Sequence, residues 1–117
     1  MISDEGETVA LSEAWTPEEL VLVGLGRCTL ASLRYHALRA GLDVVGNASA
    51  RGVVTKRDRD GRYAFTELDV EVDVELDPAP GDLTELLAKA ERDCFISASL
   101  TPKTRYRWRV NGEDVAR

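Results

Sequence analysis

Residues 63–76 alternate between apolar and acidic side chains almost without exception. Leucine and valine occupy the even positions from Leu68 to Leu76, while glutamate and aspartate occupy the odd positions from Glu67 to Glu75. Because successive side chains of a strand point to opposite faces of a sheet, the pattern predicts a half-buried antiparallel strand. The fold therefore needs an apolar layer that covers one face of this strand.

A second alternating segment, residues 104–110, carries arginine where the first carries acid. Arg105, Arg107 and Arg109 face one way, and the aromatic and apolar side chains between them face the other. Opposite charges on neighbouring strands attract, so we expect the two segments to pair. The acidic stripe is then a solvated face with arginine partners rather than a cation site. Residues 42–55 predict a further strand, which a turn at Asp60-Gly61 follows.

Residues 17–40 form a predicted helix with strong end signals. Thr16 can cap it, Pro17 suits its first position, Glu19 completes a capping box and Gly41 ends it. Residues 20–25 are apolar on every face, so this half of the helix must be covered all round. Its glycines, at positions 24 and 26, suggest that another backbone passes close, and in so short a chain this points to a partner subunit.

A second predicted helix spans residues 81–93, after a break at Pro78 to Pro80. It carries one apolar stripe, formed by Leu83, Leu86, Leu87, Ala90 and Cys94. Cys94 is therefore expected to point inward. Together the segments predict a single α+β domain over residues 1–117, with an antiparallel sheet and two main helices.

Charge and composition exclude several classes of partner. The chain has 117 residues, a net charge of −6 and a sequence pI near 4.8, which argues against a nucleic-acid surface. Residues 1–7 lack the features of a secretory signal, and the longest apolar run is far below the ~20 residues that cross a bilayer. We therefore expect a cytoplasmic protein with no membrane partner.

Cys28 and Cys94 are the only cysteines, and two interpretations of them stay open. Free cysteines are often inert and buried, but a pair can also supply a nucleophile and its resolving partner. A stable structural disulfide is not expected in the cytoplasm. Two distant cysteines and a single histidine, His36, do not make a metal ligand set, so no metal or other cofactor is expected. His36 is expected on the helix surface, and the aromatic residues Trp15, Tyr35, Phe65 and Trp108 are expected in the core or an interface.

Three segments of the chain carry a family resemblance, namely Thr16-Pro17-Glu18-Glu19-Leu20, the apolar run to Cys28, and Asp93-Cys94-Phe95-Ile96-Ser97. Together they resemble the OsmC/Ohr family of osmotically inducible and organic hydroperoxide resistance proteins. The resemblance implies an intertwined homodimer with two central helices packed between sheets. It also implies that Cys28 is the peroxidatic cysteine, that Cys94 is the resolving cysteine and that Glu18 orients a catalytic arginine. Reducing equivalents would come from a dithiol, such as a lipoylated protein.

Two departures from the family pattern concern the site. No arginine precedes Arg27, so the chain is expected to be an N-terminally abbreviated member, and Phe95 stands where the family usually has proline. A reactive thiolate needs a nearby cation or donor, but Arg27 and Arg34 diverge from Cys28 around the helix. Another arginine of this chain or of a second chain could substitute. Glu18 lies about 15 Å from Cys28 along the helix axis, so it would reach the site from the other subunit.

The resemblance and the cysteines together predict a thiol-dependent peroxidase of the oxidative stress response. Apolar surroundings of Cys28 favour organic hydroperoxides as substrates, because such a pocket rewards an alkyl tail. The alternative is a noncatalytic OsmC-like dimeric domain that binds an apolar small molecule while both thiols stay unreactive. The absence of an arginine upstream of the helix favours this alternative.

Overall fold

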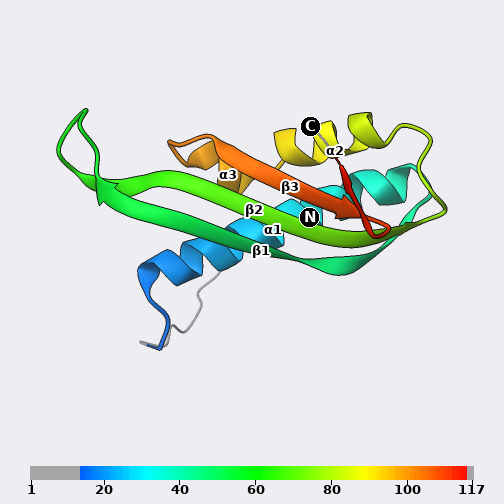
Figure 1. The fold of residues 1–117 in the computed structure, drawn as a ribbon, viewed down its shortest axis with the longest axis horizontal. Coiled ribbons are helices and arrows are strands. Elements are labelled where there is room, and N and C mark those ends of the chain that lie inside the picture. The colour runs from blue at the N-terminus through cyan, green and yellow to red at the C-terminus, as the bar shows by residue number, and fades with distance from the viewer. Residues whose placement is uncertain (1–13, 116–117) are drawn as a thin grey trace, which may run out of the picture.

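The central element of the computed structural model, which describes residues 14–115, is a four-stranded sheet with helices on one face (Figure 1). In chain order the elements are α1 (Pro17–Arg39), β1 (Asp43–Lys56), β2 (Tyr63–Asp77), α2 (Leu83–Arg92), α3 (Phe95–Ser99), β3 (Thr104–Val110) and β4 (Glu113–Val115). The predicted strands and the two main helices are thus present, within a few residues of their expected ends. The helix α3 and the strand β4 were not predicted.

The sheet order is β1-β2-β3-β4, and its strands do not all run antiparallel. β1 pairs with β2, and β3 with β4, in antiparallel fashion, whereas β2 and β3 are parallel. The expectation of a wholly antiparallel sheet is therefore wrong at this one pairing. The physical reason is the connection, because α2 and α3 carry the chain back along the sheet before β3 begins.

The pairing of the acidic and basic segments is confirmed. On the outer face of the sheet, Arg105 Nη2 lies 2.9 Å from Asp69 Oδ2, and Arg107 Nη1 lies 3.1 Å from Glu71 Oε1. These ion pairs are exposed, so each contributes little to stability. Their consequence is geometric, since they hold the charged side chains on the face opposite to the helices.

The inner face of β2 forms the centre of the hydrophobic core. Its even-numbered residues from Leu68 to Leu76 are all buried, and α1 packs across them and across β1. α2 packs against α1 and adds Leu87 to the core. Trp108 is buried and Phe65 is partly buried, as expected, whereas Trp15 and Tyr35 are about half exposed. The hairpin of β1 and β2 extends well past the helices (Figure 1).

The start of α1 follows its sequence signals closely. Thr16 Oγ1 accepts from the Glu19 amide at 3.1 Å, and Glu19 Oε1 accepts from the Thr16 amide at 3.1 Å, which completes the capping box. At the other end Gly41 has a φ of 77°, a left-handed conformation that suits glycine.

The residues that the structure describes cover the apolar half of α1 only in part. A Cβ on Gly26 would lie 3.7 Å from the carbonyl oxygen of Ala48, so the backbone close to Gly26 is β1 of the same chain. The expectation that a partner supplies this backbone is therefore wrong at Gly26. A Cβ on Gly24 would meet nothing, and Leu20 and Val23 are 41% and 49% exposed.

Candidate functional site: two buried thiols

Cys28 and Cys94 lie together, although they come from distant parts of the chain. Cys28 projects from the middle of α1, and Cys94 occupies the N-cap position of α3 just after α2 ends. Both thiols are free, and they interact with each other. Cys94 is completely buried, as its helical phase predicted, while Cys28 keeps 8% of its surface exposed.

Burial raises the pKa of the Cys28 thiol. The backbone N–H of Ile96 acts in the opposite direction, the neighbouring Cys94 thiol raises the pKa further, and the N–H of Phe95 again lowers it. Burial penalises the charged form, whereas amide donors favour it. None of these groups is an arginine or lysine, so the surroundings of Cys28 within residues 14–115 leave it mainly as the neutral thiol at pH 7.

Cys94 sits in a cluster of buried hydroxyl groups. Thr29 Oγ1 lies 3.5 Å from Cys94 Sγ, and it also donates a 3.0 Å hydrogen bond to the carbonyl of Leu25. Ser97 Oγ bonds Thr104 Oγ1 at 2.8 Å in the same region. Sequence reasoning missed this cluster, because nothing in the pattern of α1 shows that Thr29 faces α3 rather than solvent.

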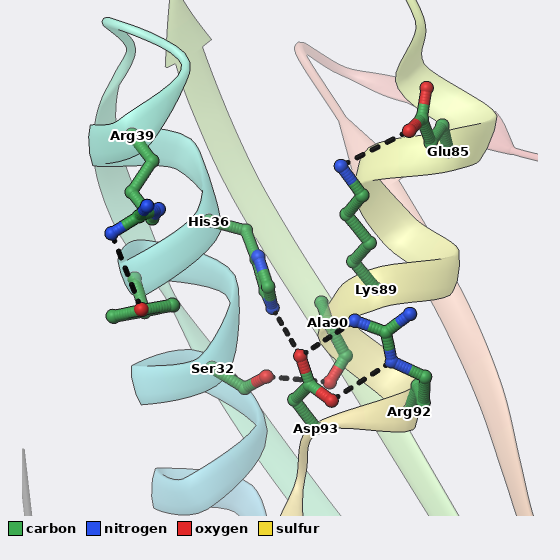
Figure 2. A network of polar contacts seen from close by, with 9 residues as sticks. Ser32, His36, Arg39, Glu85, Lys89, Ala90, Arg92 and Asp93 are labelled. Atoms are coloured by element: carbon green, nitrogen blue, oxygen red, sulfur yellow. Dashed lines mark hydrogen bonds and ion pairs between the residues drawn. The ribbon is translucent and has the colours of Figure 1, made fainter.

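Asp93, the residue before Cys94, fastens the end of α2 to α1. His36 Nε2 lies 2.7 Å from Asp93 Oδ2, and Arg92 Nε donates to Asp93 Oδ1 at 2.9 Å, as Figure 2 shows. The bonds from Arg92 and then from His36 lower the pKa of Asp93 to about 2. We expected His36 on the helix surface, but its side chain is only 12% exposed.

A buried hydrogen bond ties the same two helices together one turn earlier in α1. Ser32 Oγ donates to the carbonyl of Ala90 at 2.8 Å, next to the His36 contact (Figure 2). The α2 segment that leads to Cys94 is therefore held to α1 at two points.

The structure does not bring Glu18 to the thiols within this chain. Glu18 is exposed in the first turn of α1, and ten helical residues separate it from Cys28, about 15 Å along the axis. The arginines considered for Cys28 also lie elsewhere. Arg105 and Arg107 bond acidic residues on the outer face of the sheet, Arg51 stands opposite Asp69 on that face, and Arg27 borders a groove between α1 and β1.

That groove has a volume of about 490 Å³ and a largely apolar lining. On the α1 side it is lined by Trp15, Leu22, Val23 and Leu30. Ala48 and Ala50 of β1 line the opposite side. Neither cysteine lines it. We expected apolar surroundings for a substrate at Cys28, but the apolar groove lies on another side of α1, because α2 and α3 fill the side of the helix that carries Cys28.

Residues 14–115 also contain no cluster of metal ligands and no helix suited to crossing a membrane. Within that range no three His, Cys, Asp or Glu side chains gather closely enough to hold a metal ion. Nor does any helix there have the length and apolar character needed to cross a membrane.

The fold and the site define the class of this protein. It is a small α+β protein with a buried pair of free thiols. Residues 10–109 match the family of OsmC-like proteins, and the chain belongs to that family. No curated protein matches the chain in a sequence comparison.

Solved structures share the fold at low sequence identity. An OsmC-like protein of unknown function from Vibrio cholerae is 20% identical, with a TM-score of 0.69 over 79% of this chain and 62% of that one. The organic hydroperoxide resistance protein OhrB of Bacillus subtilis is 17% identical, with a TM-score of 0.59 over 82% and 70% of the two chains. An organic hydroperoxide resistance protein from Elizabethkingia anophelis is 21% identical, with a TM-score of 0.60 over 87% and 73%. The chain thus spans less than two thirds of the Vibrio protein.

Proposed function

We propose that this protein is a thiol-dependent peroxidase that reduces organic hydroperoxides in the cytoplasm as part of an oxidative stress response. The observation that carries the proposal is the meeting of two free thiols with unequal access to solvent. Cys28, which keeps some exposed surface, is the peroxidatic cysteine, and the fully buried Cys94 is the resolving cysteine. Two relatives of the same fold are named as organic hydroperoxide resistance proteins, which supports this choice of substrate.

In the first step, the Cys28 thiolate attacks the terminal oxygen of the hydroperoxide. A sulfur–oxygen bond forms and the oxygen–oxygen bond breaks, so that Cys28 is oxidised to a sulfenic acid and the alkoxide leaves as the alcohol after taking up a proton. The amides of Phe95 and Ile96 favour the thiolate, but burial outweighs them in the isolated chain. A cation must therefore be added for efficient reaction at neutral pH.

In the second step, Cys94 attacks the sulfenic sulfur of Cys28. The sulfur–sulfur bond forms, the sulfur–oxygen bond breaks, and the oxygen leaves as water with the proton from the Cys94 thiol. An external dithiol, such as the lipoyl group of a lipoylated protein, then reopens the disulfide by two successive exchanges. No cofactor enters this cycle.

The proposal includes an intertwined homodimer. Leu20 and Val23 are exposed at the apolar half of α1, beside the groove that Trp15 and β1 complete. A second chain that covers this surface would remove apolar area from water. In the intertwined arrangement, the second chain would in addition reach the thiols and supply the missing charges, namely an arginine for Cys28 and Glu18 to orient that arginine.

One observation favours a second candidate, a noncatalytic dimeric domain that binds an apolar small molecule. The groove of about 490 Å³ is apolar and contains neither cysteine. If no cation reaches Cys28, its raised pKa leaves little thiolate at neutral pH. The thiols would then be unreactive and the groove would be the functional site.

The test follows consumption of cumene hydroperoxide by the purified protein, with dihydrolipoamide as reductant. The wild type should turn over repeatedly, and Cys28→Ser should abolish consumption. In a parallel reaction without dihydrolipoamide, Cys94→Ser should allow one turnover and leave sulfenic acid at Cys28, which dimedone traps and mass spectrometry detects.

Cys94→Ser is also the matched control, because it removes a buried thiol of the same size without removing the nucleophile. If excess cumene hydroperoxide causes no loss of thiols in the wild type, and Cys28 remains unmodified by mass, the binding domain replaces the peroxidase.

A further inference from the structure

Tyr106 brings an unpaired hydroxyl group to the thiol cluster from β3. Its ring stacks on Trp108 with the centroids 5.9 Å apart, and no residue of 14–115 forms a hydrogen bond of ordinary geometry with its buried Oη. Ser97, Thr29 and Cys94 lie close enough to affect its pKa, which burial raises. A buried hydroxyl without a partner is unfavourable, so any state of the protein that supplies a partner is stabilised.

The other hydroxyl groups of the cluster already take part in hydrogen bonds. Thr29 has a single hydroxyl hydrogen, and it is donated to the carbonyl of Leu25. The contact of 3.5 Å between Thr29 Oγ1 and Cys94 Sγ therefore has the thiol as donor. Thr29 thus accepts a hydrogen bond from the Cys94 thiol, but it has no hydrogen left to donate to the Cys94 thiolate. Ser97 and Thr104 share one hydrogen bond of 2.8 Å, which uses one of their two hydroxyl hydrogens.

We propose that Tyr106 is the hydrogen-bond donor to the Cys94 sulfur when Cys94 attacks oxidised Cys28. The inference rests on the proposed function, since it assigns a role within its second step. As the Cys94 thiol gives up its proton to the leaving oxygen, the sulfur changes from donor to acceptor, and the neighbouring Tyr106 hydroxyl, which has no partner of its own among residues 14–115, can donate to it. Tyr106 keeps its own proton throughout the step.

The experiment replaces the peroxide by methyl methanethiosulfonate, which converts a thiol to its methyl disulfide with release of methanesulfinate. The Cys94 thiolate then attacks Cys28 sulfur, so that the internal disulfide forms and methanethiolate leaves. Quenched-flow mass spectrometry follows gain and loss of the methylthio group separately. These two rates separate the reactivity of Cys28 from that of Cys94.

Tyr106→Phe retains the ring stack and removes only the hydroxyl. We expect loss of the methylthio group to slow by about tenfold or more, the value of one charge-assisted hydrogen bond, while its gain changes less than about twofold. Tyr63→Phe is the matched control, because it removes the same atom from a tyrosine that is 74% exposed in the hairpin. That variant should leave both rates unchanged.

The outcomes separate the donor role from the peroxidase. If the wild type consumes cumene hydroperoxide but Tyr106→Phe loses the methylthio group as fast as the wild type, the donor role is overturned and the peroxidase stands. If peroxide is not consumed but Tyr106→Phe slows methanethiol release alone, the donor role holds without the peroxidase. Equal slowing of both steps would indicate a general loss of packing and would overturn the donor role.

Discussion

At the scale of single residues, Asp93 shows how a surface carboxylate can support a buried thiol. It receives hydrogen bonds from Arg92 and His36 at the point where α2 ends and the chain turns to Cys94. Because His36 belongs to α1, the contact fixes this turn relative to the helix that carries Cys28. Ser32 and the carbonyl of Ala90 add a buried bond at the same junction.

The Asp93 contact makes part of the stability depend on pH. The pKa of Asp93 is about 2 in the folded protein and about 3.9 in an unfolded chain, so the carboxylate stabilises the fold above pH ~4. This contribution is lost as the pH falls through 2. Asp93→Asn should therefore lower the urea midpoint at pH 7, and its difference from the wild type should shrink at pH 2.5.

Asp60→Asn provides the control for this prediction. Arg57 likewise lowers the pKa of Asp60 to about 2, but the pair lies in the loop between β1 and β2. Asp60→Asn should therefore show a similar pH dependence of stability. Asp93→Asn should also speed the alkylation of Cys94, because Asp93 fixes the turn that leads to Cys94. Asp60→Asn should leave that alkylation rate unchanged. A midpoint difference for Asp93→Asn that is the same at both pH values would contradict the argument.

At the scale of elements, local signals predict what local physics determines. The capping box at Thr16 and the glycine at position 41 located both ends of α1, and the alternation of β2 identified its buried face. The direction of β3 could not be predicted this way, because the pairs of Arg105 and Arg107 with acidic residues fit parallel and antiparallel neighbours equally well. β4 has three residues, too few for a pattern, although Asn111-Gly112 before it is a typical hairpin turn.

The site shows the same division between local and tertiary information. Helical phase predicted that Cys94 points inward. The cluster of Thr29, Ser97 and Tyr106 depends on how α1, α3 and β3 meet, and so does the position of the apolar groove. Neither follows from the spacing of residues along one element.

The packing of α2 on α1 leads to a prediction at this scale. Leu87 is completely buried in the stripe of α2, so Leu87→Ala should lower the free energy of unfolding by about 2–5 kcal/mol. Urea unfolding measures the change. Leu38→Ala is the control, because Leu38 is 67% exposed near the end of α1 and should change stability by less than about 0.5 kcal/mol. Equal effects of the two substitutions would show that α2 does not pack as described.

At the scale of the whole molecule, one end of α1 is better covered than the other. The C-terminal half packs on α2, while the N-terminal half borders the apolar groove and exposes Leu20 and Val23. The proposed homodimer answers this asymmetry, because a second chain would cover the exposed half and complete the site.

Val23→Glu should convert the proposed dimer to a monomer at micromolar concentration, since a charge buried without a partner is unfavourable. Light scattering measures the mass, and peroxide consumption should fall together with it. Leu38→Glu, also an exposed apolar residue of α1 but outside the groove, should leave the dimer intact. A wild-type protein that is monomeric under these conditions would rule out the intertwined dimer.

The distance along the chain between Cys28 and Cys94 has a thermodynamic consequence. A bond between them would close a loop that contains the end of α1, the hairpin of β1 and β2, and α2. In the chain-entropy description, closing a loop of this length removes enough freedom from the unfolded chain to stabilise the fold by about 4 kcal/mol. In the proposed catalytic cycle, oxidation by each peroxide would therefore raise the free energy of unfolding, and reduction by each dithiol would lower it again.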